Sequence, residues 1–426
     1  MKRKQFQKSL LAIMVGAIST QVLAVEFDLG QGKNIWASES FNEPVTITGQ
    51  FSRVVDSNTT DPAGLGFANT HIQGSLINRA DITLDSQGRT IRAIAIDPMF
   101  WTGPTGLAAG TVTGDVVQAG NVLMRNGAYE GLEIGPTTIG GSLINSGTIR
   151  STPPVGTVTT PGYLGGGEGI YLHGTTIAGD VSNTGVIDMA GPGAIGLILD
   201  VNSGTPTTIG GKILNSGSII ATGEGAWGVE VETDTSPLRI ENSGLISANG
   251  DEAKGLFLYG GTFDYILNTG TIEAKGASAN AFDLSGASFA QNSATGARGI
   301  VNRGLIAADG TAIHVDTAEQ VASFEINQQA GEIRSNSGIA VDANNLASLN
   351  WTGGKITGDM LNLSAVNIDG QAAFNGSRII APVSVNSGSL NLSAPGTAIT
   401  GDLNVASGAG IDMHLADSVV PTTPYL

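Results

Sequence analysis

The sequence contains no cysteine and few aromatic or charged residues. Of its 426 residues, none is cysteine, 5% are aromatic and 13% are charged. Disulfide bonds are therefore excluded, although an exported protein would be free to form them. A chain that crosses a pore unfolded has a physical reason to avoid crosslinks, so the absence of cysteine agrees with export.

Basic residues are scarce as well. Lysine and arginine number 20 against 37 aspartates and glutamates, which gives a formal net charge of −17. Four of the basic residues lie within the first eight positions, so the chain after residue 24 has 16 basic residues and a net charge of −21. This excess of negative charge argues against nucleic acid and anionic lipid as partners. It also favours the solubility of a repetitive β protein.

Long apolar runs are missing after the N-terminus. The chain begins with a basic head, continues with the apolar run Leu10 to Ile18, and has Val22-Leu23-Ala24 ahead of Val25. These features predict a secretory signal peptide over residues 1–24. The apolar run is too short to span a membrane, and no later stretch approaches eighteen apolar residues. We therefore expect an exported chain with no membrane-spanning helix.

Glycine and aliphatic residues are abundant, and they occur in a repeated unit. The stretch IGGKILNSGSIIATGEGAWGVEVE, from Ile209 to Glu232, typifies the unit, and its turn has the form Asn-x-Gly-x-Ile. Successive copies are 26 to 40 residues apart. A fixed minimum spacing, which some copies exceed, indicates one structural unit whose loops tolerate insertions. The first residues of the turns are Asn78, Gln118, Asn145, Asn183, Asn215, Asn242, Asn268, Asn302 and Gln329.

Each unit contains three short apolar segments bounded by Gly, Asn, Ser and Thr, which is the pattern of strands and turns. One three-stranded coil cannot bury its own apolar side chains, but stacked coils enclose a continuous core between parallel strands about 4.8 Å apart. The sequence therefore predicts an all-β, single-stranded parallel β-helix with three sides and almost no helix after the signal peptide. Right-handed coiling is expected. Residues 25–426 correspond to roughly fifteen coils and on the order of 70 Å.

The turn asparagines and glutamines occupy equivalent positions on successive coils. Stacking would place amide above amide in a ladder of side-chain hydrogen bonds along the axis. The simpler alternative is that Asn-Ser-Gly is only a favourable turn sequence. The glycine two residues after the amide supplies either a positive φ or a close approach of backbones.

The chain divides by the regularity of its repeats. Residues 25–53 show no clean copy of the turn and are interpreted as a first coil or cap, since terminal repeats must cover an open edge. Residues 54–350 form β-helix with long loops, and residues 351–426 form minimal coils that look truncated. Phe100 and Trp101, in one of the loops, either contact a partner or cover the edge of a coil.

Two columns of outward-facing residues are predicted on the strands that follow the glycine-rich corner. Neighbouring acids in them, such as Glu230 with Asp200 and Glu232, or Asp316 with Asp342, suit general acid–base chemistry or calcium. No basic residue stands in either column, so charge that opposes edge pairing is the alternative. The first column is Ala95, Glu133, Tyr171, Ile198, Glu230, Phe257, Asp283, His314 and Ala340; the second is Asp97, Gly135, His173, Asp200, Glu232, Tyr259, Ser285, Asp316 and Asp342.

Tyr171, Phe257 and Tyr259 on the same face are candidates for stacking on sugar rings or on a host protein, with cross-strand packing as the alternative. The histidines have no metal-ligand spacing. No cofactor and no metal is expected. The four histidines are His71, His173, His314 and His414.

The signal peptide, the Asn-Ser-Gly-x-Ile coils and the late segment Leu403 to Met413, LNVASGAGIDM, together resemble the passenger region of bacterial autotransporters of type V secretion. The resemblance covers most of the chain after the signal peptide. It implies passage through the periplasm of a Gram-negative bacterium, an outer-membrane barrel as partner, and display at the cell surface or release. No barrel sequence follows Leu426, which departs from the family pattern and suggests a fragment.

These observations predict a non-enzymatic, secreted or surface-displayed adhesin-like passenger. It would present loops and one face to host or bacterial surface glycans or proteins. The alternative is a secreted β-helical polysaccharide lyase or hydrolase, because such folds also carry clustered acids. Acids without basic neighbours favour the first function.

Overall fold

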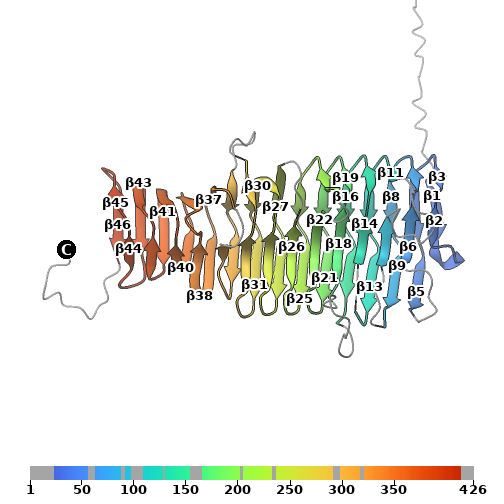
Figure 1. Ribbon diagram of the computed structural model, residues 1–426, viewed down its shortest axis with the longest axis horizontal. Helices are drawn as coiled ribbons and strands as arrows, with labels where there is room; N and C mark the ends of the chain where they lie inside the picture. Colours follow the sequence, from blue (N-terminus) through green and yellow to red (C-terminus); the bar gives the residue numbers. More distant parts are fainter. Residues whose placement is uncertain are drawn as a thin grey trace, which may run out of the picture.

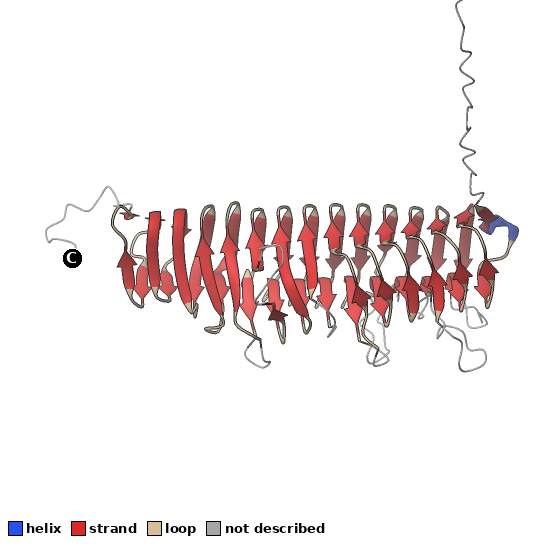
Figure 2. Ribbon diagram, turned by 90° about the horizontal axis from the view of Figure 1, so that it is seen from above, coloured by secondary structure: helices blue, strands red, loops and turns tan. Residues whose placement is uncertain are grey.

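The protein is a straight rod built from stacked coils of β-strand, as the computed structural model shows (Figure 1). The structure describes residues 24–55, 63–87, 92–96, 109–127, 130–153, 166–201, 205–232, 237–290, 298–316 and 321–413. Strands dominate these residues, and the one helical element among them is the 3-10 turn η1, Leu29–Gln31, at the first coil (Figure 2). The fold is the predicted all-β parallel β-helix. No helix of the described residues is long and apolar enough to cross a membrane.

The first side of the rod, which we call the ladder face, contains the strands that end at the turn asparagines. The pairings between its strands are parallel, so the chain returns to this face once per coil. Its strands are β1 (Val25–Asp28), β4 (Val45–Thr48), β8 (Leu76–Asn78), β12 (Val116–Gln118), β16 (Leu143–Asn145), β20 (Val181–Asn183), β24 (Ile213–Asn215), β27 (Leu238–Asn242), β30 (Thr262–Asn268), β34 (Gly299–Asn302), β37 (Phe324–Gln328), β39 (Ala347–Trp351), β41 (Ala365–Asn375), β43 (Val383–Leu392) and β45 (Leu403–Val405).

The second face follows the turn. Its strands are β5 (Gln50–Val54), β9 (Asp81–Asp85), β13 (Asn121–Arg125), β17 (Thr148–Ser151), β21 (Val186–Ala190), β25 (Ser218–Thr222), β28 (Leu245–Asn249), β31 (Thr271–Lys275), β35 (Leu305–Ala308), β38 (Glu332–Asp342), β40 (Lys355–Leu361) and β46 (Gly410–Met413). The long strands β38 and β40 continue from this face onto the third, and β41 and β43 continue from the ladder face onto this one.

The third face follows the glycine-rich corner and carries the candidate site. Its strands are β2 (Ile35–Ala37), β6 (Ala63–Ala68), β10 (Arg92–Ile96), β14 (Glu130–Ile134), β18 (Glu168–His173), β22 (Ile195–Asp200), β26 (Trp227–Val231), β29 (Lys254–Leu258), β32 (Asn280–Leu284), β36 (Ile313–Val315), β42 (Arg378–Ile380) and β44 (Ala398–Thr400).

The cross-section is not three-sided along the whole rod. A short extra sheet adds a fourth strand to the early coils, between the third face and the ladder face. The periodicity did not reveal it because its strands are only two or three residues long. They are β3 (Ser40–Phe41), β7 (His71–Ile72), β11 (Gly110–Val112), β15 (Thr137–Ile139), β19 (Thr176–Ile177) and β23 (Thr208–Ile209); a further short strand, β33 (Ser288–Phe289), pairs with β30.

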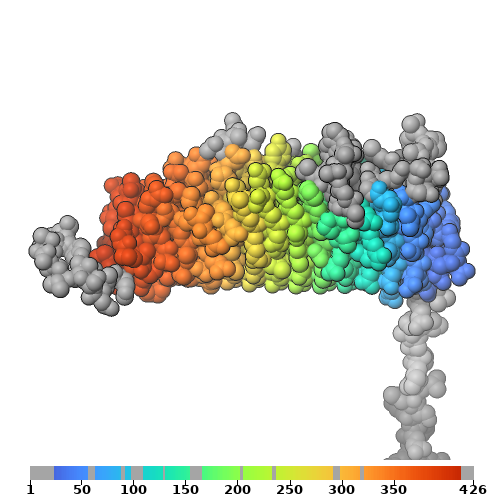
Figure 3. Space-filling model, turned by 90° about the horizontal axis from the view of Figure 1, so that it is seen from below, coloured from blue at the N-terminus to red at the C-terminus, as the bar shows by residue number. Residues whose placement is uncertain are grey.

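The core is a stack of aliphatic side chains from all three faces. On the third face Ile94, Leu132 and Ile170 are register partners and are at most 3% exposed. Alternation between buried and outward residues within each strand produces this arrangement, because successive side chains of a strand point to opposite sides. Sequence order follows the rod axis, so each coil packs against its neighbours in the chain (Figure 3).

The turn glycines are needed for close contact between coils. A Cβ atom on Gly217 would lie 2.1 Å from the carbonyl oxygen of Gly185 on the preceding coil. Gly217 is not among the residues with positive φ. Of the two reasons that the sequence offered for this glycine, the structure therefore selects the close approach of backbones.

The two ends of the described rod differ. At the first coil, the ring of Trp36 is fully buried, stacks on Phe67 at 5.1 Å and contacts Phe27 at 5.0 Å. At the last coil, Leu403 and Val405 are each 45% exposed and Met413 is 67% exposed. The apolar positions are thus covered at the first coil and open at the last.

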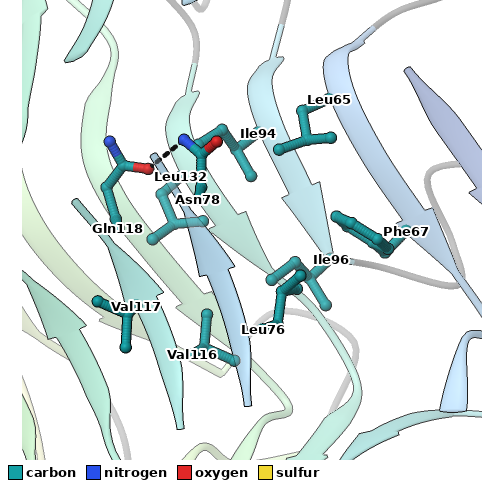
Figure 4. Close-up of a pocket in the computed structure, with 10 residues that line it drawn as sticks. All are labelled: Leu65, Phe67, Leu76, Asn78, Ile94, Ile96, Val116, Val117, Gln118 and Leu132. Carbon is teal, nitrogen blue, oxygen red and sulfur yellow. Dashed lines mark hydrogen bonds between the residues drawn. The ribbon is translucent and has the colours of Figure 1, made fainter. Parts of the chain in front are cut away.

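The interior leaves little free space. A gap near the N-terminal end, between the ladder face and the third face, is lined by Leu65, Phe67, Asn78 and Gln118, among others (Figure 4). Its volume is about 10 Å³, about enough for one water molecule. This gap is too small for a ligand larger than water.

Candidate functional site: an internal amide ladder and the outer third face

The turn amides form a hydrogen-bonded ladder inside the rod. Asn183 Nδ2 donates to Asn215 Oδ1 at 2.8 Å, and Asn215 Nδ2 donates to Asn242 Oδ1 at 2.8 Å. The asparagines are at most 5% exposed. Most of these amides also bond the backbone; Asn215 Nδ2, for example, reaches the carbonyl oxygen of Leu245 at 3.0 Å. The remaining links are Asn78 to Gln118, Asn145 to Asn183, Asn242 to Asn268, Asn268 to Asn302 and Asn302 to Gln328.

One predicted member of the ladder is wrong by one residue. Gln328, not Gln329, pairs with Asn302 and accepts from its Nδ2 at 2.8 Å. The turn after Gln328 has one extra residue before Gly331, so counting back from the glycine selects the neighbouring glutamine. Gln329 is exposed and bonds Arg303.

The ladder is interrupted once and then replaced. Gln118 Nε2 turns to the carbonyl oxygen of Gly120 at 3.0 Å, and Oδ1 of Asn145, its register partner, is buried without a hydrogen bond. Above Gln328 the position is taken by Trp351, whose indole donates to the carbonyl oxygen of Gly353 at 3.0 Å. On later coils the position becomes aliphatic.

On the outer side of the third face the first predicted column has the predicted register as far as His314. Its last member is wrong: Asp342, not Ala340, pairs with His314, and Ala340 is fully buried. Asp342 is therefore not the partner of Asp316 in the second column. The reason is that β38 runs from the second face to the third without the usual corner.

A third outward column was missed. Each member is the first residue of its strand and lies three residues before that strand's member of the first column. A search for outward residues at every second position does not find this spacing. It contains two basic residues, Arg92 and Lys254, so the expectation that the acids have no basic neighbours was wrong. The column is Arg92, Glu130, Glu168, Ile195, Trp227, Lys254 and Asn280.

At the N-terminal part of this face, buried charges are paired. Nε of Arg92 lies 2.8 Å from Oε2 of Glu130 and also contacts Oε2 of Glu133. Nε2 of His173 lies 3.2 Å from the other oxygen of Glu133. Both glutamates are 1% exposed. Buried charges of this kind are stable only when they are paired and hydrogen-bonded.

The network continues along the rod through a tyrosine and three carboxyl groups. Tyr171 stacks on His173 with ring centroids 4.8 Å apart, and its hydroxyl donates to Oδ2 of Asp200 at 2.7 Å. Glu232 shares side-chain hydrogen bonds with Asp200 and with Glu230. Adjacent carboxyl groups can share hydrogen bonds only if some of them hold protons.

Burial raises the pKa values of the acids in this row. The pKa of Glu230 rises to about 9, first because the group is buried and then because Glu232 and Asp200 are nearby. The pKa of Glu168 rises to about 8, mainly through burial, with the charges of Glu133 and Asp200 acting in the same direction. Burial also raises the pKa of Glu232. Glu230 and Glu168 therefore carry protons at neutral pH.

The aromatic residues lie next to these acids. Phe257 contacts Trp227 at 4.9 Å and Tyr259 at 5.7 Å between ring centroids. Phe257 and Tyr171 are buried, at 9% and 8% exposure, so cross-strand packing accounts for them. Tyr259 is 50% exposed and is the most accessible of the three. Phe100 and Trp101 lie outside the described residues.

A lysine side chain is held within this aromatic group. Nζ of Lys254 lies 3.7 Å from the ring centroid of Phe257, 5.8 Å from that of Trp227, and 3.6 Å from Oδ1 of Asp283. An ammonium group is thus bound between aromatic rings and a carboxylate. Within the part of the chain that the structure describes, no group of three or more His, Cys, Asp or Glu residues is arranged to hold a metal ion.

Comparison with models of known protein families, with curated proteins and with solved structures gives no match. The stacked parallel coils place the chain among parallel β-helix proteins.

Proposed function

We propose that the protein is a non-enzymatic, exported β-helical passenger of the autotransporter type, which binds surface glycans through its third face. The observation that carries this proposal is the exposed ring of Tyr259, which continues the row formed by Trp227 and Phe257. Aromatic rings beside carboxylates provide both a stacking surface and hydrogen-bond acceptors for sugars. The acidic rod would then act as a stiff support that holds this face away from the cell.

The burial of the acids supports binding rather than catalysis. Glu230 and Glu133 are 2% and 1% exposed, so a substrate cannot reach them without movement of the surrounding chain. Their partners are other side chains of the same face, and they join neighbouring coils. The exposed aromatic residue of the face, Tyr259, belongs to the coil after that of Glu230.

The binding function is tested with the full chain on a glycan array and on bacterial and host cells. Tyr259→Ala should lower binding by about five- to thirtyfold, because one stacked ring contributes about 1–2 kcal/mol. Val54→Ala is the matched control, since Val54 is 62% exposed on β5, far from this face. Equal binding by the Tyr259 variant and the parent protein would reject this face as the binding site.

Export is tested separately. Expression of the full chain in a Gram-negative host, followed by N-terminal sequencing of the mature protein, should show cleavage after Ala24. A cytoplasmic protein that retains Met1 would contradict the proposed localisation.

A β-helical polysaccharide lyase or hydrolase is the second candidate. It is favoured by one observation: the protonated carboxyl of Glu168 lies near Arg92 and Asp200, and that of Glu230 lies near Asp200. If it is correct, the protein will release reducing or unsaturated ends from a polysaccharide, and Glu230→Gln will abolish the release. Absence of product across neutral, acidic and basic polysaccharides rejects this candidate.

A further inference from the structure

The third face binds an ammonium group from its own chain, and this shows which chemistry the face accepts. Lys254 Nζ is placed against Phe257 and near Asp283, at 3.7 and 3.6 Å. Phe257 and Asp283 occupy the same column on adjacent coils. The recognition unit is therefore an aromatic ring beside a carboxylate one coil away, about 4.8 Å along the rod.

The second column repeats this unit at its exposed ring. The backbone N–H of Tyr259 donates to the carbonyl oxygen of Val231 at 3.0 Å, which places Tyr259 and Glu232 side by side on adjacent coils. The order along this column is Asp200, Glu232, Tyr259 and Ser285. Glu232 is more buried than Tyr259, which is 50% exposed. This pair differs from the Phe257 and Asp283 pair in its access to solvent.

The charge around Tyr259 restricts the ligand further. Asp200 and Glu232 lie on one side of the ring along the rod, and Asp283 lies on the other side. Lys254 is the one basic residue in the columns of this region, and it is already paired with Asp283. A ligand with carboxylate or sulfate groups would be repelled here, whereas an ammonium group would be attracted.

On this basis we propose that Tyr259 and Glu232 form a binding site for glycans with free amino groups, in which the sugar ring stacks on Tyr259 and its ammonium group pairs with Glu232. The inference rests on the proposed glycan-binding function and adds the class of sugar. It excludes polymers of uronic acids.

Isothermal titration of the full chain with three oligosaccharides of equal length tests the proposal. The probes are a chitosan oligomer with free amines, the N-acetylated chitin oligomer and an oligogalacturonate. We expect the chitosan oligomer to bind at least tenfold more tightly than the chitin oligomer, and the oligogalacturonate not to bind. Tyr259→Phe should retain binding and Tyr259→Ala should lose it.

The charge is tested by Glu232→Gln, which should remove the preference for chitosan over chitin. Glu224→Gln, at an exposed acid on the loop before β26, is the control and should leave the preference intact. Equal affinities of the parent protein for chitosan and chitin, both lost in Tyr259→Ala, would overturn the amino-sugar proposal while the glycan-binding function stands. No Tyr259-dependent binding of any sugar would overturn both.

The last experiment uses polylysine as the probe. If it binds in a manner that requires Tyr259 and Glu232 while chitosan does not bind, the ligand is a basic protein and the glycan proposal is wrong.

Discussion

At the scale of single residues, the ladder asparagines stabilise the rod because each amide joins two coils. The amide of Asn215 accepts from Asn183 and donates to Asn242 and to the carbonyl oxygen of Leu245. It is 4% exposed, so water cannot replace these partners. An asparagine side chain has both donors and an acceptor, which allows the same contact to repeat along the axis.

Replacing Asn215 by Leu should therefore lower the free energy of unfolding by about 1–3 kcal/mol, because buried polar groups lose their partners. Chemical denaturation checks this. Asn391→Leu, at an exposed position of β43, is the matched control and should change stability much less. Equal losses in the two variants would contradict a stabilising role of the ladder.

Asn126, which also lies outside the ladder, is not a suitable control. Its φ is 60°, and its side chain donates to Asp85 at 2.7 Å. A leucine there would be strained and would lose this hydrogen bond.

The buried carboxyl Glu230 predicts a stability that depends on pH. Its pKa is about 9 in the folded protein, against 4.5 for an unperturbed glutamate, because of burial and the nearby carboxyls Glu232, Asp200 and Glu168. Between these values the folded state holds a proton that the unfolded chain releases. The free energy of unfolding should therefore be highest below about pH 4.5 with respect to this group and should fall as pH rises toward 9.

Glu230→Gln, which resembles the protonated form, should remove the part of this loss of stability at high pH that Glu230 causes. Thermal melting across pH 4 to 9 should show the variant more stable than the parent at pH 9, by a few kcal/mol at most, and similar to it at pH 4. Glu224→Gln should leave the profile unchanged. Parallel profiles of parent and Glu230→Gln would show that Glu230 is already ionised in the folded protein.

At the scale of elements, the ladder shows that side-chain length matters as much as polarity. Gln118 and Asn145 lie on paired strands, β12 and β16, yet Gln118 turns to Gly120 and leaves Oδ1 of Asn145 without a partner. The extra methylene of glutamine lets its amide reach the backbone of its own turn. The interruption divides the ladder into a short N-terminal part and a long one that begins at Asn145.

Gln118→Asn should join the two parts and raise the free energy of unfolding by about 0.5–1.5 kcal/mol, the usual net contribution of one hydrogen bond. Denaturant unfolding and hydrogen exchange of β12 and β16 measure the effect. Asn242→Gln, in the continuous part of the ladder, is the converse substitution and should destabilise. A less stable Gln118→Asn variant would mean that the bond to Gly120 outweighs the continuity of the ladder.

At the scale of the whole molecule, the rod is stable along its length but open at the last described coil. Strand β45 exposes Leu403 and Val405, and β46 exposes Met413. Edge strands with exposed apolar residues pair with other chains. The net charge of −17 opposes such association, but salt limits the reach of charge to about 8 Å at physiological ionic strength.

We therefore expect the full chain to self-associate or to fray from this coil, more strongly in moderate than in low salt. Light scattering measures the association, and hydrogen exchange along the chain locates the fraying. Val405→Lys should reduce association, whereas Val54→Lys, on β5 at the first coils, should not. A monomer with protected amides through Met413 would show that this edge is covered.

The sequence by itself determined the repeat, the strand pattern, the parallel stacking and most of the ladder. These features depend on local rules: alternation along a strand, glycine where coils touch, and an amide at the same position in each turn. Asn145 to Asn302 follow the rule in every copy, so aligning the turns placed them correctly. The short fourth strands and the extra residue after Gln328 broke the rule and escaped detection.

Only the tertiary structure decided which charges meet on the third face. Glu133 and His173 are 40 residues apart, and the lengths of the intervening loops do not specify which of their atoms come together. Arg92 belongs to a column that alternation does not predict, and Asp342 reaches its place because β38 passes from one face to the next without a corner. Burial has the same origin, since neighbouring coils, and not the residue type, determine that Glu230 is hidden while Tyr259 is exposed.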